Sequence, residues 1–169
     1  MGQPPAEADV EAEKFMDNQL VVVAPPDHPL AGRKKIPLAR LQEETFLVRE
    51  SGSGTRSAME RFFAERDMQL KTGMEVGSNE AIKQSVQAGL GLGLLSHATI
   101  EQELVLKRLV VLDVADFPIM RHWYVVHRRG KRLSAAAEAF KQFMLKEPAT
   151  LLTTRAEDKP GGKIKRGRR

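Results

Sequence analysis

The sequence lacks cysteine, has few aromatic residues (5%) and has no long apolar run. Without cysteine the chain forms no disulfide, and a zinc site is disfavoured. Its longest apolar run, Leu90–Leu95, is interrupted by Gly91 and Gly93 and falls well short of the roughly 20 residues that cross a bilayer. The first ten residues carry no cationic-then-apolar pattern of the kind an export signal needs. We therefore expect a cytoplasmic chain that does not enter a membrane.

Catalytic patterns are also missing. No Gly-x-Ser-x-Gly elbow occurs, and none of the four histidines has a spacing that ties it to a carboxylate. His122 and His127 flank one expected strand at an odd spacing, so their side chains should point to opposite faces and not share a metal. We expect no enzymatic activity and no metal.

A glycine run, Gly89-Leu90-Gly91-Leu92-Gly93, superficially resembles a dinucleotide-binding fingerprint. It follows an expected helix and precedes an expected strand, which is the reverse of the order that places pyrophosphate at a helix start. We interpret it as a helix stop followed by close backbone packing, and we expect no cofactor.

Positive charge is concentrated at the end of the chain. The formal net charge is +5, and residues 155–169 hold seven Lys/Arg and two Asp/Glu, so the remainder is neutral. With Pro160, Gly161 and Gly162 and little that is apolar, residues 148–169 are expected to form a disordered basic tail. Non-specific attraction to nucleic acid phosphates is the alternative function for this tail.

Strand-like and helix-like segments alternate from about residue 20 to residue 146, which predicts an α/β fold with a mostly parallel sheet. The expected helix over residues 55–66 carries Met59, Phe62 and Phe63 on one buried face. Ser96 should cap a short helical stretch, Ser134 should cap the last helix, and the lone Trp123 should belong to the core. The expected strands are Leu20–Val23, Phe46–Val48, Gly73–Val76, Leu92–Leu95, Leu109–Leu112 and Trp123–Val126.

The beginning of the chain is acidic and weakly patterned. Residues 1–18 offer no evident partner for the strand at Trp123–Val126 or the helix at Ala135–Met144, whose apolar faces need one. We expect part of the fold to lie upstream of Met1.

Two strand-to-helix loops are the strongest candidates for binding. In the first, glycines allow a tight turn, and free amides at the following helix start favour an anion, which Arg49 and Arg56 could clamp. An ordinary Gly-Ser turn that caps a helix is an equally good interpretation. The second loop has the same form, and ligands of open α/β sheets bind at this carboxyl edge of the strands. The candidate residues are Ser51, Gly52, Ser53, Gly54, Thr55 and Arg56 in the first loop and Gly77, Ser78, Asn79 and Glu80 in the second.

A family resemblance extends over residues 15–145. LVVVAPPDHPLA at Leu20–Ala31, Gly54 with Arg56, Gly77-Ser78-Asn79-Glu80 and the glycine run resemble, in order, the effector-binding domain of LysR-type transcriptional regulators. FLVRESGSGTRSAMERFF, GLGLGLLS and FPIMRHWYVVHRRGKRLS resemble more narrowly the regulators of carbon-fixation (RuBisCO) operons.

That resemblance implies a type II periplasmic-binding-protein-like fold with the second lobe complete and the first lobe partial. Residues 1–18 would be a remnant of lobe one, 19–113 the second lobe, 114–147 a return segment to lobe one, and 148–169 the tail. The function implied is sensing of a small anionic, phosphorylated metabolite in an interlobe cleft, within a dimer or tetramer that contacts DNA only through a helix-turn-helix domain absent from this chain. A solute-binding receptor of a transporter, which shares the fold, is the alternative.

Overall fold

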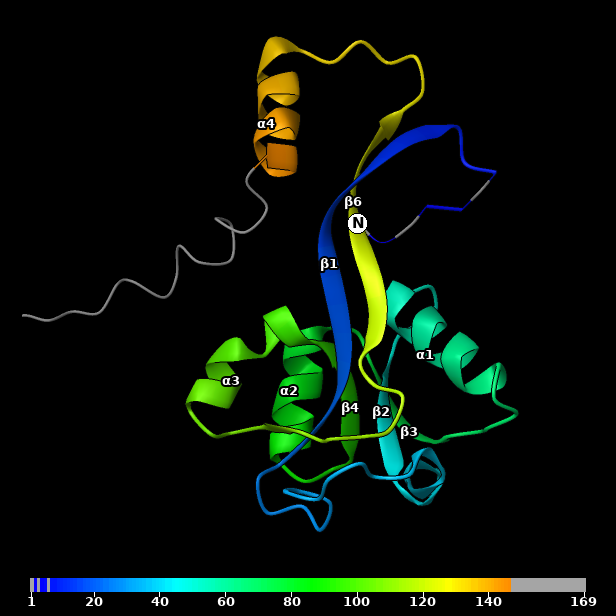
Figure 1. Cartoon of the computed structure of the whole chain (residues 1–169), viewed down its shortest axis with the longest axis vertical. Coiled ribbons are helices and arrows are strands. Elements are labelled where there is room, and N and C mark those ends of the chain that lie inside the picture. Colours follow the sequence, from blue (N-terminus) through cyan, green and yellow to red (C-terminus); the bar gives the residue numbers. More distant parts are fainter. Residues whose placement is uncertain (1, 3, 6, 147–169) are drawn as a thin grey trace, which may run out of the picture. The chain divides into compact units, whose positions relative to one another are not determined.

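Helices and strands alternate along most of the computed structural model, which describes residues 2, 4–5 and 7–146 (Figure 1). The expected α/β class is confirmed, whereas the predicted disordered tail at 148–169 lies outside the described residues. The strands are β1 (Val10–Ala24), β2 (Thr45–Arg49), β3 (Lys71–Val76), β4 (Leu92–Ser96), β5 (Val110–Val111) and β6 (Ile119–Arg128). The helices are α1 (Gly54–Ala64), α2 (Asn79–Gln87), α3 (Glu101–Val105) and α4 (Ala135–Lys146), with 3-10 turns η1 (Leu38–Glu43) and η2 (His97–Thr99).

The sheet is mixed, so the expectation of a mostly parallel sheet was wrong. Its order is β3-β2-β4-β1-β5, and β6 also pairs with β1. Strand β2 runs parallel to β3 and β4, but β1 is antiparallel to both β4 and β5. Parallel neighbours need a crossover connection, usually a helix. Helices α1 and α2 supply it between β2, β3 and β4, whereas the chain from β1 to β2 contains only the short turn η1.

The chain divides into two compact units, and each boundary falls inside a strand. One unit comprises Asp17–Trp123 together with Gly2, and the other comprises the described residues of 3–16 and 124–146. The boundaries therefore interrupt β1 after Met16 and β6 after Trp123.

In the unit Asp17–Trp123, the sheet is covered on both faces. Strand side chains alternate between two buried clusters, as the two-residue period of a strand requires. One cluster joins Val22, Phe46 and Leu94 to Met59, Phe62 and Phe63 of α1, which confirms the predicted buried face of that helix. The other joins Val21, Val23, Leu47 and Leu95 to Ile82 and Val86 of α2. Helices α1 and α2 consequently lie on opposite faces of the sheet (Figure 1).

The glycine run packs as the sequence predicts. Gly89 follows α2 with φ +74°, the left-handed conformation that commonly ends a helix. A Cβ atom at Gly91 would lie 2.6 Å from the carbonyl oxygen of Thr45, and one at Gly93 would lie 3.0 Å from side-chain atoms of Ile82 and Val86. Close backbone approach therefore explains these two glycines.

In the other unit, the expectation that residues 1–18 give the last strand no partner was wrong. Strand β1 begins at Val10, and β6 pairs with β1. Charged residues such as Glu11, Glu13 and Lys14 have low strand propensity, so their pattern did not indicate a strand. Oppositely charged side chains pair within this unit: Lys141 pairs with Glu13, and Arg129 Nε lies 3.3 Å from Asp9 Oδ1.

Helix α4 begins as predicted, with Ser134 Oγ accepting a hydrogen bond from the Ala137 amide (3.2 Å). Its aromatic side chains are not covered within the described chain, because Phe140 is 63% exposed and Phe143 is 43% exposed. None of the described helices combines the length and the apolar character that a membrane span requires.

Candidate functional site

The two predicted loops lie next to each other at the carboxyl edge of the parallel strands. Arg49, the last residue of β2, is in register with Val76, the last residue of β3. The first loop (Ser51–Arg56) leads from β2 into α1, and the second loop (Gly77–Glu80) leads from β3 into α2. Parallel strands end at the same edge of a sheet, so the structure brings the starts of two helices together there.

The first loop forms a tight turn that ends in a helix cap. Gly52 has φ +84°, a conformation that glycine adopts without strain. Ser53 is the N-cap residue, and its Oγ accepts a hydrogen bond from the Thr55 amide (3.3 Å). Within the described chain the amides of Gly54 and Arg56 and the hydroxyls of Ser51 and Thr55 make no hydrogen bond. They remain as donors for a ligand.

The second loop repeats this arrangement. Ser78 is the N-cap residue of α2, and its Oγ accepts from the Ala81 amide (3.1 Å). The amides of Asn79 and Glu80 have no partner among the residues described. Glu80 lies in the first turn, where the helix dipole favours a carboxylate, and ion pairing with Lys83 (2.7 Å) lowers the pKa of that carboxyl.

Arg49 joins the two loops. Its Nη1 donates to Asn79 Oδ1 (2.5 Å), while Nε and Nη2 donate to the two carboxylate oxygens of Glu50 (both 2.6 Å). This two-point pairing raises the pKa of Arg49 and lowers the pKa of Glu50. The hydrogen bond to Asn79 fixes the second loop against the first. The pairing with Glu50 neutralises the charge of Arg49 within the chain.

Arg56 is likewise paired. Its Nε lies 2.8 Å from Glu60 Oε1, and its Nη1 lies 2.5 Å from Glu75 Oε2 and 3.1 Å from the carbonyl oxygen of Arg49. The hydrogen bonds that Arg56 donates to Glu60 and then to Glu75 raise the pKa of Arg56. The guanidinium holds the first loop against β3. Because it is already paired with carboxylates, it is not free to clamp an anion.

A polar cluster that the sequence did not indicate lies at the same edge. With its amide oriented to satisfy both ends, Asn18 donates to Ser96 Oγ (2.6 Å) and accepts from Trp123 Nε1 (2.9 Å) and Arg121 Nη2 (3.2 Å). Asn18 and Ser96 are the buried polar residues of the described chain, at 4% and 7% exposure. Arg121 Nη1 also donates to the Gly54 carbonyl oxygen (2.6 Å), which ties this cluster to the first loop.

Two sequence expectations fail at this cluster. Ser96 precedes η2, but its hydroxyl bonds to Asn18 and makes no capping hydrogen bond. Trp123 was expected in the core but is only partly buried, and its indole N–H donates to the amide oxygen of Asn18. No local pattern could have revealed the cluster, since its residues are up to 105 positions apart in the sequence and meet only through the pairing of β1 with β6 and β4.

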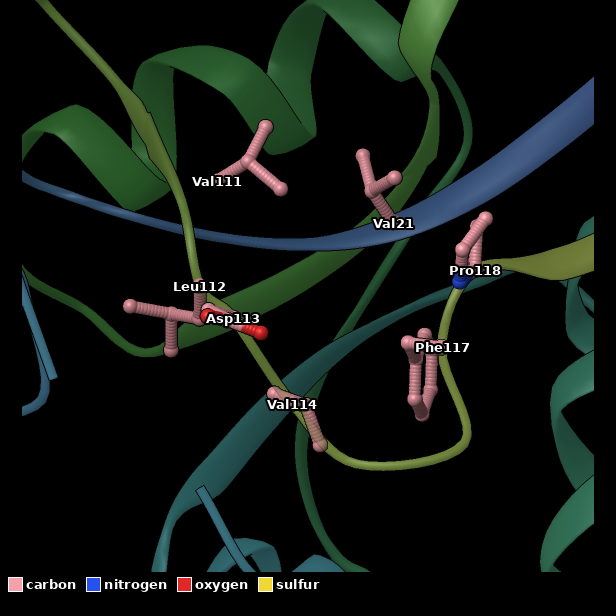
Figure 2. Close-up of a pocket in the computed structure, with 7 residues that line it drawn as sticks. All are labelled: Val21, Val111, Leu112, Asp113, Val114, Phe117 and Pro118. Carbon is pink, nitrogen blue, oxygen red and sulfur yellow. The ribbon is translucent and has the colours of Figure 1, made fainter. Parts of the chain in front are cut away.

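Two open hollows lie away from the loops. One, of about 250 Å³, is lined by β1, β5 and the chain that follows β5, and Figure 2 shows Asp113 among mainly apolar side chains. The other, also about 250 Å³, lies at the opposite edge of the sheet from the loops and includes His28 and Glu44. Carboxylates in both make them poor sites for an anion. The lining residues of the first are Val21, Val111, Leu112, Asp113, Val114, Phe117 and Pro118.

Three histidines meet carboxylates that sequence spacing did not reveal. His28 Nε2 lies 3.6 Å from Glu44, His122 Nδ1 lies 2.9 Å from Asp17, and His127 Nε2 lies 3.8 Å from Glu11. Each pair joins different elements of the fold. Among the described residues, no group of three or more His, Cys, Asp or Glu side chains is arranged to hold a metal ion.

The family model for the LysR substrate binding domain matches residues 1–149, which is most of the chain. The chain belongs to the LysR substrate-binding domain family. It is 62% identical over 151 residues to the RuBisCO operon transcriptional regulator of Allochromatium vinosum, with 89% of this chain and 50% of that protein covered. The chain spans about half the length of the curated relatives it matches.

Solved LysR structures share the fold. The regulatory domain of Synechocystis PCC6803 CcmR in complex with 2-PG (2-phosphoglycolate) matches with a TM-score of 0.82 and 39% identity, covering 92% of this chain and 73% of that one. The effector-binding domain of QuiR in complex with shikimate matches with a TM-score of 0.76 and 26% identity, covering 85% of this chain and 68% of that one. These matches confirm the periplasmic-binding-protein-like fold, and the curated relative named above is a transcriptional regulator.

Proposed function

We propose that this LysR domain senses a small anionic, phosphorylated metabolite and thereby controls the transcription of carbon-fixation genes. The observation that carries the proposal is the pair of helix starts held together by Arg49 and Asn79, with unpaired amides and hydroxyls at one edge of the sheet. Such a helix start favours an anion through both its free N–H groups and its dipole. The relatives named for the RuBisCO operon and the neighbour bound to 2-phosphoglycolate support the choice of genes and ligand.

The proposed ligand contacts are the ten residues predicted from the sequence, namely Ser51, Gly52, Ser53, Gly54, Thr55, Arg56, Gly77, Ser78, Asn79 and Glu80. Amides and hydroxyls make the contacts, and Arg56 acts by bracing the first loop. Residues 19–113 form the second lobe of the domain, 1–18 and 114–147 belong to lobe one, and the whole regulator acts as a dimer or tetramer. DNA contact is made by a helix-turn-helix domain of the whole regulator.

Titration calorimetry of the chain with 2-phosphoglycolate tests the proposal. We expect saturable binding that Thr55→Ala weakens about fivefold, the usual effect of losing one hydrogen bond. Thr72→Ala is the matched control, because Thr72 is exposed near the start of β3, at the opposite end of the strand from the loops. Absence of binding, or equal losses in the two variants, contradicts the proposed function or its site.

A further inference from the structure

Arg121 differs from the other two arginines at this edge of the sheet. Arg49 is paired with Glu50, and Arg56 is paired with Glu60 and Glu75. No carboxylate among the described residues lies within 4.0 Å of the Arg121 guanidinium. Carboxylates of the described chain therefore neutralise the charges of Arg49 and Arg56 but not that of Arg121.

The surroundings of Arg121 make its charge costly. The side chain is partly buried, and its buried Nε has no hydrogen-bond partner within the described residues. Burial first, and the positive charge of Arg61 second, lower the pKa of Arg121. An arginine nevertheless stays protonated in proteins, so the chain holds a partly desolvated cation beside a like charge. An anion from outside would relieve that cost.

The position of Arg121 is fixed by groups that cannot neutralise it. Gly54, the first residue of α1, accepts from Nη1 through its carbonyl oxygen, and a Cβ atom at Gly54 would lie 3.6 Å from Nη1. The amide oxygen of Asn18 accepts from Nη2 and is itself held by Ser96 and Trp123. The guanidinium is consequently held against the helix start whose Gly54 and Arg56 amides are unpaired.

We propose that Arg121 supplies the positive charge that binds the oxyanion group of the ligand, a phosphate or a carboxylate, at the start of α1, and that Asn18 positions it. This inference rests on the proposed function and names the residue that gives the site its preference for an anion. An arginine fork pairs with phosphate or carboxylate through two hydrogen bonds, which a neutral loop of amides and hydroxyls does not match.

Binding of 2-phosphoglycolate, with glycolate as its dephosphorylated counterpart, tests the proposal in the full chain. We expect Arg121→Met to weaken 2-phosphoglycolate binding about tenfold or more, the effect of losing a charged hydrogen bond. It should reduce glycolate binding less if phosphate is the group recognised, and equally if the carboxylate is. Arg121→Lys keeps the charge without the fork and should retain part of the affinity. Arg33→Met is the matched control, because exposed Arg33 follows β1 at the opposite edge of the sheet.

A thermal melt separates this role from a structural one. Arg121→Met removes a partly buried cation that no carboxylate neutralises, so the melting temperature of the ligand-free variant should stay unchanged or rise. The increase in melting temperature that 2-phosphoglycolate causes in the unsubstituted chain should be absent from the variant. Asn18→Asp is a second variant that keeps Arg121 and places a carboxylate within reach of Nη2. It should also lose 2-phosphoglycolate affinity, because the charge is then neutralised internally.

The outcomes are distinguishable. Failure of the unsubstituted chain to bind 2-phosphoglycolate overturns the proposed function and this inference with it. Binding by the unsubstituted chain together with undiminished binding by Arg121→Met or Asn18→Asp overturns the inference alone. A lower melting temperature with unchanged affinity per folded molecule would likewise assign Arg121 a structural role.

Discussion

Single residues at the two loops are constrained either by charge pairing or by backbone geometry. Arg49 and Arg56 hold the first loop in place through carboxylates that come from β3, from α1 and from Glu50, which directly precedes the loop. Backbone geometry constrains the glycines after α2. Gly89 and Gly91 both have positive φ, but only Gly91 lies against the backbone of β2.

Gly91→Ala should destabilise the fold strongly. Its φ is +154°, and the new Cβ would lie 2.6 Å from the Thr45 carbonyl oxygen, so we expect a loss of about 3 kcal/mol or more in the free energy of unfolding. Gly89→Ala is the control, because it has positive φ in open space and should cost about 1 kcal/mol. Urea denaturation measures both values, and a similar small loss in the two variants would show that the close contact is unimportant.

Residue-level reasoning from the sequence located the two loops at helix starts but not the charge balance. Ser53 and Ser78 cap their helices, and the Gly89 conformation follows from its position after α2. The ion pairs of Arg56 with Glu75 and the contacts of Arg121 depend on tertiary structure. No spacing rule connects residues that meet through neighbouring strands.

A few polar contacts between secondary-structure elements hold the second loop and α2 in position. Arg49 connects the end of β2 to the start of α2, and Lys83 connects α2 to α3 through Glu103 (2.8 Å). Helix α2 is thus held at its first turn and at its middle.

Asn79→Ala should loosen the second loop without removing a proposed hydroxyl contact. It removes the acceptor for Arg49 Nη1, a hydrogen bond to a charged group, and we expect 2-phosphoglycolate affinity to fall by about tenfold. Gln87→Ala, at the other end of α2, is the control and should not change the affinity. Calorimetry decides, and equal affinities for the two variants would mean that the link is dispensable.

The Glu80–Lys83 pair should make the stability of α2 depend on pH. The pKa of Glu80 is lowered from 4.5 by its hydrogen bond to Lys83 and then by that to Gln84. A depressed carboxyl pKa stabilises the fold above the unfolded value and loses that contribution as pH falls through the folded pKa. Glu80→Gln should therefore be less stable than the unsubstituted chain at pH 7, and the difference should shrink as pH falls below the ordinary carboxyl pKa and through the lower pKa of folded Glu80. Denaturation at a series of pH values from 7 downwards tests this, and a difference that stays constant as pH falls would contradict it.

Elements were predicted well where hydrophobic periodicity is strong. The strands at residues 20–23, 46–48 and 92–95 and the buried face of α1 are confirmed. The direction of β1 was missed because side-chain alternation reports burial and not whether neighbours are parallel. The first part of β1 was missed because a charged ribbon has no apolar face to generate a pattern.

Buried residues are concentrated in one part of the molecule. Every buried side chain of the described chain lies between Asn18 and Val114, whereas residues 124–146 contain none. The free energy that resists local opening is therefore concentrated in the unit Asp17–Trp123.

Hydrogen exchange should show this inequality. We expect amides of β4 and of Leu20–Ala24 to exchange most slowly, and those of Val10–Met16 and Tyr124–Arg128 to exchange orders of magnitude faster, because few apolar contacts oppose their opening. Mass spectrometry of peptides after timed labelling measures the rates. Uniform protection along β1 would contradict the expectation.

The division of β1 and β6 between units has a practical consequence for protein engineering. The chain passes into the unit Asp17–Trp123 along one strand and leaves along its paired neighbour, with Asp17 and His122 in contact at 2.9 Å. The first and last residues of this unit are thus adjacent in space, which is the condition for transplanting a domain into a surface loop of another protein. Residues 17–123 are accordingly a natural cassette for a genetically encoded biosensor, in which a fluorescent host would report on the state of the two loops.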